Sequence, residues 1–573
     1  MVKTAMKNDW KSLGLDAAVI ILLTLVVYLP AMRCGFVFDD YPLIVDNGIV
    51  KASDGLYRFW LTTEAPDYYP LTSSLWWLEW RLWHANPIGY HVVNVFLHAL
   101  NAVLVWLLLR RLKIPGAWAT GLVFAVHPVN VATVAWVVEQ KNTLSMLFYT
   151  VAILLYLRFY ENGRWNSYGL ALAAFLLALL SKTAVVMLPL VLLGCVWWMR
   201  GRVQRKDFLY TLPFFALSLV SGLVTIWFQN NRALEGHAAR TVDFATRLAA
   251  AGWVPWFYLY KILLPFNLTV VYSRWQVDAS HWVSFVPGII LVGCLTLFWR
   301  YRATWGRPFL FGLGYFVATL FPVLGFFDQG FYRFSLVADQ WQYYSMVGVI
   351  ALIVAAGVRI CRHMSDNGQY WFKAVGVVVL TMFAFGTWMR SSVYANNLTL
   401  WRDNVTKNPK AWLAQYHLGV ALGQVGRLHE ATQCFGEALR IKPDDPETRY
   451  NLGVALFRLG RVPEAMAQWE RALRLNPDDV AAHYNLANAL KETGKIEEAI
   501  THYEQALRIQ PDFAKAHYNL AVALRRAGEV ANSTEHCRRA IDLAIAQGDT
   551  ELANAARMQL KLYEGNSPFQ EKP

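Results

Sequence analysis

The feature that most constrains this chain is a series of long stretches without Asp, Glu, Lys or Arg. Each stretch is about long enough to cross a hydrocarbon core of about 30 Å as a helix. Backbone groups in lipid must pair within their own segment, so the sequence predicts an all-α, polytopic bundle of about 11 transmembrane helices within residues 17–390. The predicted spans are residues 17–32, 90–109, 114–138, 142–157, 165–181, 183–199, 208–231, 281–299, 308–327, 340–358 and 374–389.

Basic residues gather in alternate loops, and this pattern indicates how the bundle is oriented. They include Lys3, Lys7 and Lys11; Arg110, Arg111 and Lys113; Arg200, Arg202, Arg205 and Lys206; Arg300, Arg302 and Arg307; and Arg359, Arg362 and Lys373. By the positive-inside rule these loops and the N-terminus, residues 1–16, are cytoplasmic. The first external loop, residues 34–89, then lies outside and carries seven acidic residues against three basic ones. Topology therefore accounts for the net charge of +13, and we expect no nucleic-acid partner.

A further apolar segment, residues 248–269, is interrupted by Lys261 and Pro265. Because the pattern predicts 11 crossings from a cytoplasmic N-terminus, with the chain outside after residue 389, we interpret this segment as re-entrant or interfacial. The first apolar run lacks a small-residue cleavage site and is interpreted as an anchor. We expect a multi-pass protein of a bacterial inner membrane with its C-terminal part in the periplasm, or of the endoplasmic reticulum membrane in a eukaryote.

After Arg390 the hydropathy falls and a self-similarity with a period of 34 residues begins. The landmarks are Tyr416, Tyr450, Tyr484 and Tyr518; Gly426, Gly460, Gly494 and Gly528; Ala438, Ala472, Ala506 and Ala540; and Pro409, Pro443, Pro477 and Pro511. Four landmarks in one register predict tetratricopeptide repeats. Small Gly and Ala residues let paired helices approach closely, and Pro ends the second helix of each pair.

The repeats predict an α-solenoid of four units over residues 412–547. A linker at 391–411 precedes it, and a capping helix and tail at 548–573 follow it. Stacked repeats form an extended concave surface. Two interpretations stay open: a rigid soluble cap without a ligand, or a surface that binds a protein or peptide, which we favour.

Charged and polar residues near the outer ends of the spans are the candidates for a functional site, because such residues are costly in a membrane. Asp39 and Asp40 follow the first span in the stretch "FVFDDY". The other candidates are His127, Lys141, Lys182, Lys261, Arg274, Arg333 and Tyr343. Each has a structural alternative, since lysines extend to the interface, tyrosines form aromatic belts, His-Pro ends helices and aspartates cap them.

Together these residues are typical of transfer from a lipid-phosphate donor. The cations that would hold the departing phosphate are Lys141, Lys182, Lys261 and Arg333. Asp39 or Asp40 would accept a proton from the acceptor hydroxyl. The six cysteines show no ligand spacing, so we predict no metal site and no cofactor, and ligand spacing gives no support for a divalent cation.

Several motifs in order resemble a known family. They are "FVFDDY", "HPVNVATVAWVVEQKN", "LSKTAVVMLPL" and the trailing repeats, from about residue 15 to residue 547. This order resembles the transmembrane and tetratricopeptide-repeat-containing glycosyltransferases of the C-type superfamily, whose animal members are protein O-mannosyltransferases. The resemblance implies a polyprenyl-phosphate-linked sugar donor and an acceptor on the outer or lumenal side. It also implies a catalytic aspartate in the first external loop, where Asp39 and Asp40 match.

Three positions depart from the pattern typical of bacterial relatives. Thr133 stands in place of an acid, and Gln140 and Gln340 stand in place of arginines. We predict a membrane glycosyltransferase that transfers a sugar to an acceptor, a protein hydroxyl, with repeats that bind the acceptor or a partner. Two alternatives remain: a non-catalytic membrane-anchored repeat scaffold for an envelope complex, and a lipid or glycolipid transporter, against which the lack of paired halves argues.

Overall fold

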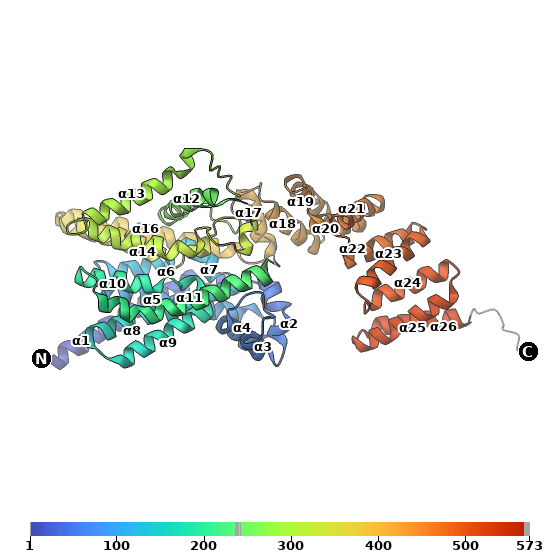
Figure 1. Cartoon of the computed structure of the whole chain (residues 1–573), viewed down its shortest axis with the longest axis horizontal. Coiled ribbons are helices and arrows are strands. Elements are labelled where there is room, and N and C mark those ends of the chain that lie inside the picture. The colour runs from blue at the N-terminus through green and yellow to red at the C-terminus, as the bar shows by residue number, and fades with distance from the viewer. Residues whose placement is uncertain (1, 235–239, 241, 566–573) are drawn as a thin grey trace, which may run out of the picture. The chain divides into compact units, whose positions relative to one another are not determined.

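The computed structural model of the chain describes residues 2–234, 240 and 242–565 (Figure 1). These residues form 26 α-helices, joined by short 3₁₀ and π segments, and contain no strand. They divide into two compact units, Met1–Asn408 and Pro409–Pro573. The predicted all-α fold class is confirmed.

The helices of the first unit follow the apolar stretches of the sequence. They are α1 (Val2–Val27), α2 (Gly48–Lys51), α3 (Gly55–Leu61), α4 (Pro70–Trp83), α5 (Pro87–Arg111), α6 (Ala117–Val126), α7 (Val131–Val134), α8 (Gln140–Asn162), α9 (Trp165–Ser181), α10 (Leu188–Arg200), α11 (Arg205–Phe228), α12 (Phe244–Leu263), α13 (Val286–Arg300), α14 (Gly306–Leu320), α15 (Met346–Arg362), α16 (Asp366–Val393) and α17 (Asn397–Lys407). Some of these helices approach backbone to backbone at glycines. A Cβ at Gly252 would lie 2.8 Å from the backbone nitrogen of Gly288, and one at Gly348 would lie 2.5 Å from the carbonyl oxygen of Gly312. Such contacts are typical of helix packing in membranes.

Seven helical segments among the described residues are long and apolar enough to cross a membrane, or eight if a bent pair counts as one span. The seven are Pro87–Arg111, Val137–Asn162, Thr183–Arg200, Arg205–Ala233, Trp282–Arg300, Gly306–Val323 and Asp366–Val393. The bent pair is Ala117–Val126 and Pro128–Val134, which meet at 49°. The chain is therefore a multi-pass membrane protein.

Three of the predicted spans coincide with shorter apolar helical segments, the first of which is Leu13–Val27 within α1. The three spans are 17–32, 165–181 and 340–358. The last is short because Asp339–Gln342 forms a 3₁₀ turn and α15 begins only at Met346. The test of length and composition thus supports seven or eight of the 11 predicted spans. The segment 248–269 contains most of α12, which is not among the seven, and its interfacial position stays a prediction.

A buried asparagine of α5 holds the broken segment between α6 and α8. Pro128 cannot donate a backbone hydrogen bond, and the chain from 127 to 139 runs through short helical turns. Nδ2 of Asn94 donates to the carbonyl oxygens of Thr133 and Val134, at 2.9 and 3.0 Å. Irregular backbone at membrane depth needs such internal partners. Helix α5 therefore fixes a segment that ends at the candidate site.

The second unit is a row of helix pairs followed by one more helix. Its helices are α18 (Trp412–Gln424), α19 (Leu428–Ile441), α20 (Pro446–Arg458), α21 (Val462–Leu475), α22 (Val480–Glu492), α23 (Ile496–Ile509), α24 (Ala514–Arg526), α25 (Val530–Ala546) and α26 (Thr550–Gly565). A Cβ at Gly453 would lie 2.5 Å from Nε1 of Trp469, so glycine lets this ring fill the space between α20 and α21. The predicted α-solenoid is confirmed. Helix α26 lies within 548–573, where a capping helix and tail are predicted, and residues 566–573 lie outside the described residues.

Candidate functional site

Asp39 and Asp40 lie in a tight turn that follows α1. Phe38 has a φ of 46°, and the π-helical segment Tyr41–Val45 begins directly after Asp40. Asp40 is fully buried, whereas Asp39 is half-buried. The two adjacent carboxylates therefore have different surroundings.

Asp40 serves as an anchor for this loop. Its Oδ2 accepts a hydrogen bond from the backbone nitrogen of Val37 at 2.9 Å, and its Oδ1 accepts one from that of Val138 at 2.8 Å. The second bond joins the loop to the 3₁₀ segment Val137–Glu139. The side chain of Asp39, in contrast, makes no hydrogen bond to any described residue. Asp40 positions the loop, and Asp39 is the carboxylate that stays available.

A buried ion cluster lies at the start of α8. Nζ of Lys141 lies 3.2 Å from Oε1 of Glu139, and Nζ of Lys182 lies 3.4 Å from its Oε2. Lys182 reaches this position because α9 ends at Ser181 and the chain turns through a 3₁₀ segment before α10. The side chains of the two lysines are 16% and 12% exposed, so both retain a small accessible surface.

Asp39 belongs to the same electrostatic environment. Burial raises the pKa of Asp39 to about 6, the charge of Lys141 opposes this shift, and the charges of Glu139 and Asp67 add to it. Asp67 comes from the same external loop, and its carboxylate accepts a hydrogen bond from Gln229. Three carboxylates and two ammonium groups thus share one electrostatic environment, in which the pKa of Asp39 is about 6.

This arrangement suits the transfer of a group from a phosphate. Ammonium groups stabilise charge that develops on a leaving phosphate. A carboxylate with a raised pKa accepts a proton from a hydroxyl. Among residues 2–234, 240 and 242–565, no group of three or more His, Cys, Asp or Glu side chains is arranged to hold a metal ion.

Lys261, a predicted phosphate ligand, lies in different surroundings. Its Nζ donates to the carbonyl oxygens of Phe266 at 2.8 Å and Asn267 at 3.2 Å. The same ammonium lies 5.1 Å from the ring centroid of Tyr272, whose hydroxyl donates to Oδ1 of Asp339 at 2.7 Å. The structure therefore assigns Lys261 to a second polar cluster, at the C-terminal end of α12, and leaves its role as a phosphate ligand a prediction.

His127 and Tyr343 are buried in the helix bundle. Nε2 of His127 lies 2.9 Å from the carbonyl oxygen of Ile262, and its Nδ1 accepts from the backbone nitrogen of Val129 at 3.3 Å. The hydroxyl of Tyr343 lies 2.8 Å from Nδ1 of His98. These contacts are structural, and they do not bring either residue to the ion cluster.

Arg274 and Arg333 are both exposed. Nη2 of Arg333 donates to the carbonyl oxygen of Leu234 at 3.3 Å. Neither guanidinium group forms an ion pair within the described residues. Of the predicted site residues, the structure brings together Asp39, Asp40, Lys141 and Lys182.

Two members of the cluster, Glu139 and Asp67, were not among the residues predicted from the sequence. Glu139 directly precedes an apolar helix, and its importance depends on Lys182, 43 residues away. A signal was present, however, because an acid and a base two residues apart at the start of a predicted span are both costly in lipid. Asp67 is one of seven acidic residues in the segment 34–89, and nothing in the neighbouring sequence marks it as a site residue.

The three departures from the bacterial pattern can now be placed. Nε2 of Gln140 donates to Oε1 of Glu79 at 2.8 Å and to the carbonyl oxygen of Tyr90 at 2.9 Å. Gln140 therefore faces Glu79, whose pKa burial raises to about 8, and not the Glu139 carboxylate. Thr133 and Gln340 are buried as well. An arginine at position 140 would therefore belong to the network of Glu79 and Tyr90 rather than to the lysine pair.

Two family models match the chain. A model described as "Dolichyl-phosphate-mannose-protein mannosyltransferase" matches residues 66–227, a range that includes Asp67, Glu139, Lys141 and Lys182. This part of the chain is therefore similar to a mannosyltransferase family. A second model, "TPR repeat", matches residues 419–460, 455–494 and 487–528. The predicted combination of a mannosyltransferase domain with tetratricopeptide repeats is confirmed.

The chain is also similar to curated proteins with related names. It is 23% identical to "Protein O-mannosyl-transferase F38B6.6" of Caenorhabditis elegans over 461 residues, 76% of this chain and 64% of the relative. It is 25% identical to human "Protein O-mannosyl-transferase TMTC3" over 477 residues, 73% of this chain and 50% of the relative. Identity rises to 36% with Drosophila melanogaster "Protein O-mannosyl-transferase Tmtc1", over 29% of this chain and 20% of the relative. The chain thus spans less than two thirds of the length of each of these relatives.

Proposed function

We propose that the chain is a membrane glycosyltransferase that moves a sugar from a polyprenyl-phosphate-linked donor to a protein hydroxyl outside the cytoplasm. The observation that carries this proposal concerns Asp39. Its carboxylate makes no hydrogen bond to a described residue, and the positive charge of Lys141 acts on it. Lys182 shares the carboxylate of Glu139 with Lys141. The names of the family model and of the relatives support mannose as the sugar.

In the proposed reaction the oxygen of the acceptor hydroxyl attacks the anomeric carbon of the sugar. The bond from this carbon to the phosphate oxygen breaks, and its electrons leave with polyprenyl phosphate. Asp39 takes the proton of the hydroxyl, while Lys141 and Lys182 stabilise the charge on the departing phosphate. A single displacement of this kind inverts the configuration of the anomeric carbon.

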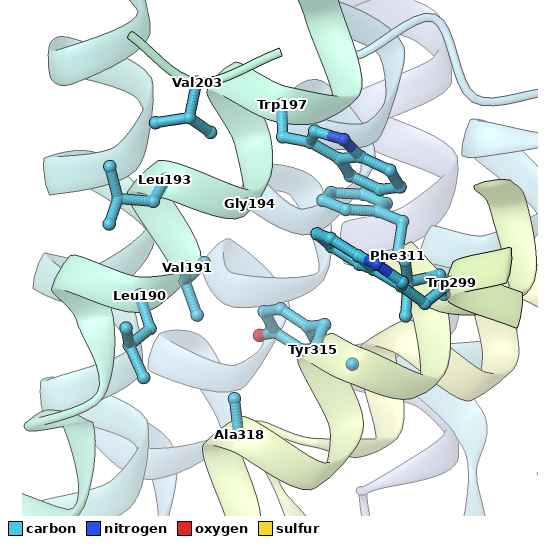
Figure 2. Close-up of a pocket in the computed structure, with 12 residues that line it drawn as sticks. Leu190, Val191, Leu193, Gly194, Trp197, Val203, Trp299, Phe311, Tyr315 and Ala318 are labelled. Atoms are coloured by element: carbon cyan, nitrogen blue, oxygen red, sulfur yellow. The ribbon is translucent and has the colours of Figure 1, made fainter. Parts of the chain in front are cut away.

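An apolar cavity of about 280 Å³ between α10 and α14 supports a donor with a hydrocarbon chain (Figure 2). Its lining includes Leu190, Leu193, Trp197, Trp299, Phe311 and Ala318. Tyr315, also in the lining, donates its hydroxyl to the carbonyl oxygen of Tyr344 at 3.2 Å. The hydroxyl of Tyr344 in turn lies 3.3 Å from the carbonyl oxygen of Asn142, whose side chain bonds Glu139. These contacts link the cavity to the charged cluster.

The repeat domain would bind the protein acceptor or a partner, on the same side of the membrane as the acidic loop. The last helix of the first unit, α17, supports this placement. The backbone nitrogen of Phe38, next to Asp39, donates to Oδ1 of Asn397 at 2.9 Å. Helix α17, which precedes the repeats in the sequence, thus lies against the acidic loop. In a bacterium that side is the periplasm, and in a eukaryote it is the lumen.

The experiment that tests this function is sugar transfer by the full chain in liposomes. Labelled mannosyl phosphoryl polyprenol is supplied with a protein fraction, and label that alkaline β-elimination releases from protein is counted. We expect transfer that falls about tenfold or more in Lys182→Gln and is unchanged in the matched variant Lys206→Gln, which alters an exposed lysine. A folded chain that transfers no label would favour the non-catalytic scaffold.

A further inference from the structure

The loop that carries Asp39 rests against α17, the helix that leads to the repeats. We infer that Asn397 and Trp401 of α17 are positioning residues, which hold Phe38 in the conformation that directs Asp39 toward the substrate. The inference rests on the proposed function, in which Asp39 is the base. It assigns a role in the reaction to a segment, 391–411, whose sequence indicates only a linker.

The conformation of Phe38 is the starting point. Its φ of 46° lies in the left-handed region, which is unfavourable for a residue with a bulky side chain. Such a conformation persists only where the surroundings enforce it, and it is frequent next to functional groups. Asp39 is the next residue, so the direction of its carboxylate depends on the backbone of Phe38. Since Asp39 makes no side-chain hydrogen bond to a described residue, its position relies on that backbone.

Helix α17 supplies two contacts that hold Phe38. Oδ1 of Asn397 accepts a hydrogen bond from the backbone nitrogen of Phe38 at 2.9 Å. The ring of Trp401, one helical turn further on, meets the Phe38 ring edge to face, with centroids 5.0 Å apart and planes at 89°. The ring of Trp136, which precedes the segment of Glu139, also packs against Phe38, with ring centroids 5.7 Å apart and planes at 31°. Backbone and side chain of Phe38 are both restrained.

The chain just before Phe38 is joined to the same region. The backbone nitrogen of Gly35 donates to the carbonyl oxygen of Ala395 at 2.9 Å. A Cβ at Gly35 would lie only 3.2 Å from that oxygen, so the two backbones are close. Sγ of Cys34 lies 3.5 Å from the carbonyl oxygen of Ser391. The loop therefore follows the junction of α16 and α17 over several residues.

Helix α17 is itself fixed, so it can serve as a support. Oδ1 of Asn404 accepts hydrogen bonds from the backbone nitrogens of Val270 and Val271, at 3.0 and 2.9 Å. Asp403 pairs with Arg390 of α16 and, at 2.7 Å, with Lys407. Buried and partly buried polar contacts of this kind hold the helix in one position. A change at Asn397 should therefore release Phe38 rather than move α17.

The test compares two neighbouring asparagines of the full chain in liposomes. Asn397→Ala removes the acceptor for the Phe38 N–H, and Asn397→Asp keeps an acceptor. Asn396→Ala is the matched control, because Asn396 is exposed and its side chain caps α17 by accepting from the backbone nitrogen of Thr399. We expect Asn397→Ala to lower kcat about tenfold or more at an unchanged donor KM, Asn397→Asp to restore most of it, and Asn396→Ala to keep kcat within about twofold.

A second readout separates a positioning role from general destabilisation. Hydrogen exchange of the segment 34–46 should be faster in Asn397→Ala than in Asn396→Ala, and Trp401→Phe should retain more activity than Trp401→Ala. The inference is overturned if Asn397→Ala and Asn396→Ala have the same kcat while Asp39→Asn abolishes transfer. Full transfer by Asp39→Asn would instead overturn the proposed function, and the inference with it.

Discussion

Nζ of Lys182 lies 3.4 Å from Oε2 of Glu139, although 43 residues separate them in the sequence. The other carboxylate oxygen of Glu139 lies 3.2 Å from Nζ of Lys141. A buried charge is costly unless it is paired. Glu139 therefore allows two ammonium groups to lie near each other before any phosphate is bound, and the charge of one of them, Lys141, acts on Asp39. This pre-organised pair is what makes the site suitable for a phosphate-linked donor.

The first prediction concerns Glu139→Gln. Removal of the carboxylate charge leaves Lys141 and Lys182 to repel each other, so at least one ammonium group should move or lose its proton. We expect the KM for the lipid-linked donor to rise about tenfold, because cations contribute to phosphate binding through charge. Glu161→Gln is the control, since Glu161 pairs with Arg111 at 2.7 Å in a more exposed position. Equal donor KM in the two variants would argue against the role of Glu139.

The second prediction concerns Asp40→Asn, a change that tests the anchor role. An amide offers only one oxygen, so it cannot accept from the backbone nitrogens of both Val37 and Val138 as Asp40 does. One buried N–H then loses its partner, and we expect the free energy of unfolding to fall by about 1–3 kcal/mol. Thermal unfolding in detergent measures this. Asp39→Asn loses no such bond and removes a charge whose burial is unfavourable. It should therefore unfold at or above the wild-type temperature, and an equal loss in both variants would contradict the assignment.

The third prediction concerns the pH dependence of transfer. The pKa of Asp39 is raised by burial to about 6. A general base acts only when it is deprotonated, so kcat should fall as the pH drops through about 6. A pH profile of the labelled-donor assay measures this, with protein folding checked at each pH. Activity that stays constant down to about pH 4.5 would show a base with the ordinary pKa of a carboxyl group.

Histidine pairs in the repeats give the fourth prediction. Nδ1 of His483 lies 2.9 Å from Nδ1 of His502, and the same distance joins His517 to His536. Because the carbonyl oxygen of Pro477 only accepts, Nε2 of His483 carries the proton and His502 donates to Nδ1. Burial lowers the pKa of His502, His517 and His536. The unfolded chain then binds more protons, so these pairs lose stability as the pH falls through about 6.5.

Hydrogen exchange on the full chain measures this effect. Helices α22 to α25 should lose protection between about pH 7.5 and pH 5.5, after correction for intrinsic exchange, while α20 and α21 should not. The second repeat offers the control, since Nη1 of Arg449 bonds Oε1 of Gln468 at 3.2 Å and Nη2 bonds the Pro443 carbonyl at 2.7 Å. The double variant His483→Arg with His502→Gln copies this pair and should abolish the pH dependence in its repeat. If it does not, the histidine pair is not the cause.

Much of the fold could be predicted from the sequence because its determinants are local. Residues such as Tyr450 and Gly460 recur every 34 residues, and this period predicts the repeats. Apolar runs located the membrane helices, and seven or eight of the 11 predicted spans are long and apolar enough among the described residues. The others coincide with shorter helices, since length in a sequence does not reveal where a helix breaks. Asp339, for example, belongs to a 3₁₀ turn before α15.

The candidate site was harder to predict from the sequence, because its residues are far apart in the chain and only the fold brings them together. Asp39, Lys141 and Lys182 were predicted from their cost at span ends, and the structure brings them together. Glu139 was missed because its partner Lys182 is distant in sequence. Lys261 had the same signal as the other lysines, yet its Nζ donates to carbonyl oxygens of Phe266 and Asn267 five and six residues further on. Hydropathy does not distinguish these two surroundings.

The central claim is that Asp39 is the base of a glycosyl transfer, and one comparison tests it most directly. Transfer of label from mannosyl phosphoryl polyprenol to protein is measured for Asp39→Asn and for Asp46→Asn, the same change at an exposed acid of the same loop. The account predicts that Asp39→Asn loses at least about a hundredfold in kcat while it still binds the donor and unfolds no earlier than wild type. It predicts that Asp46→Asn keeps wild-type transfer. Transfer by Asp39→Asn at the wild-type rate would contradict the account.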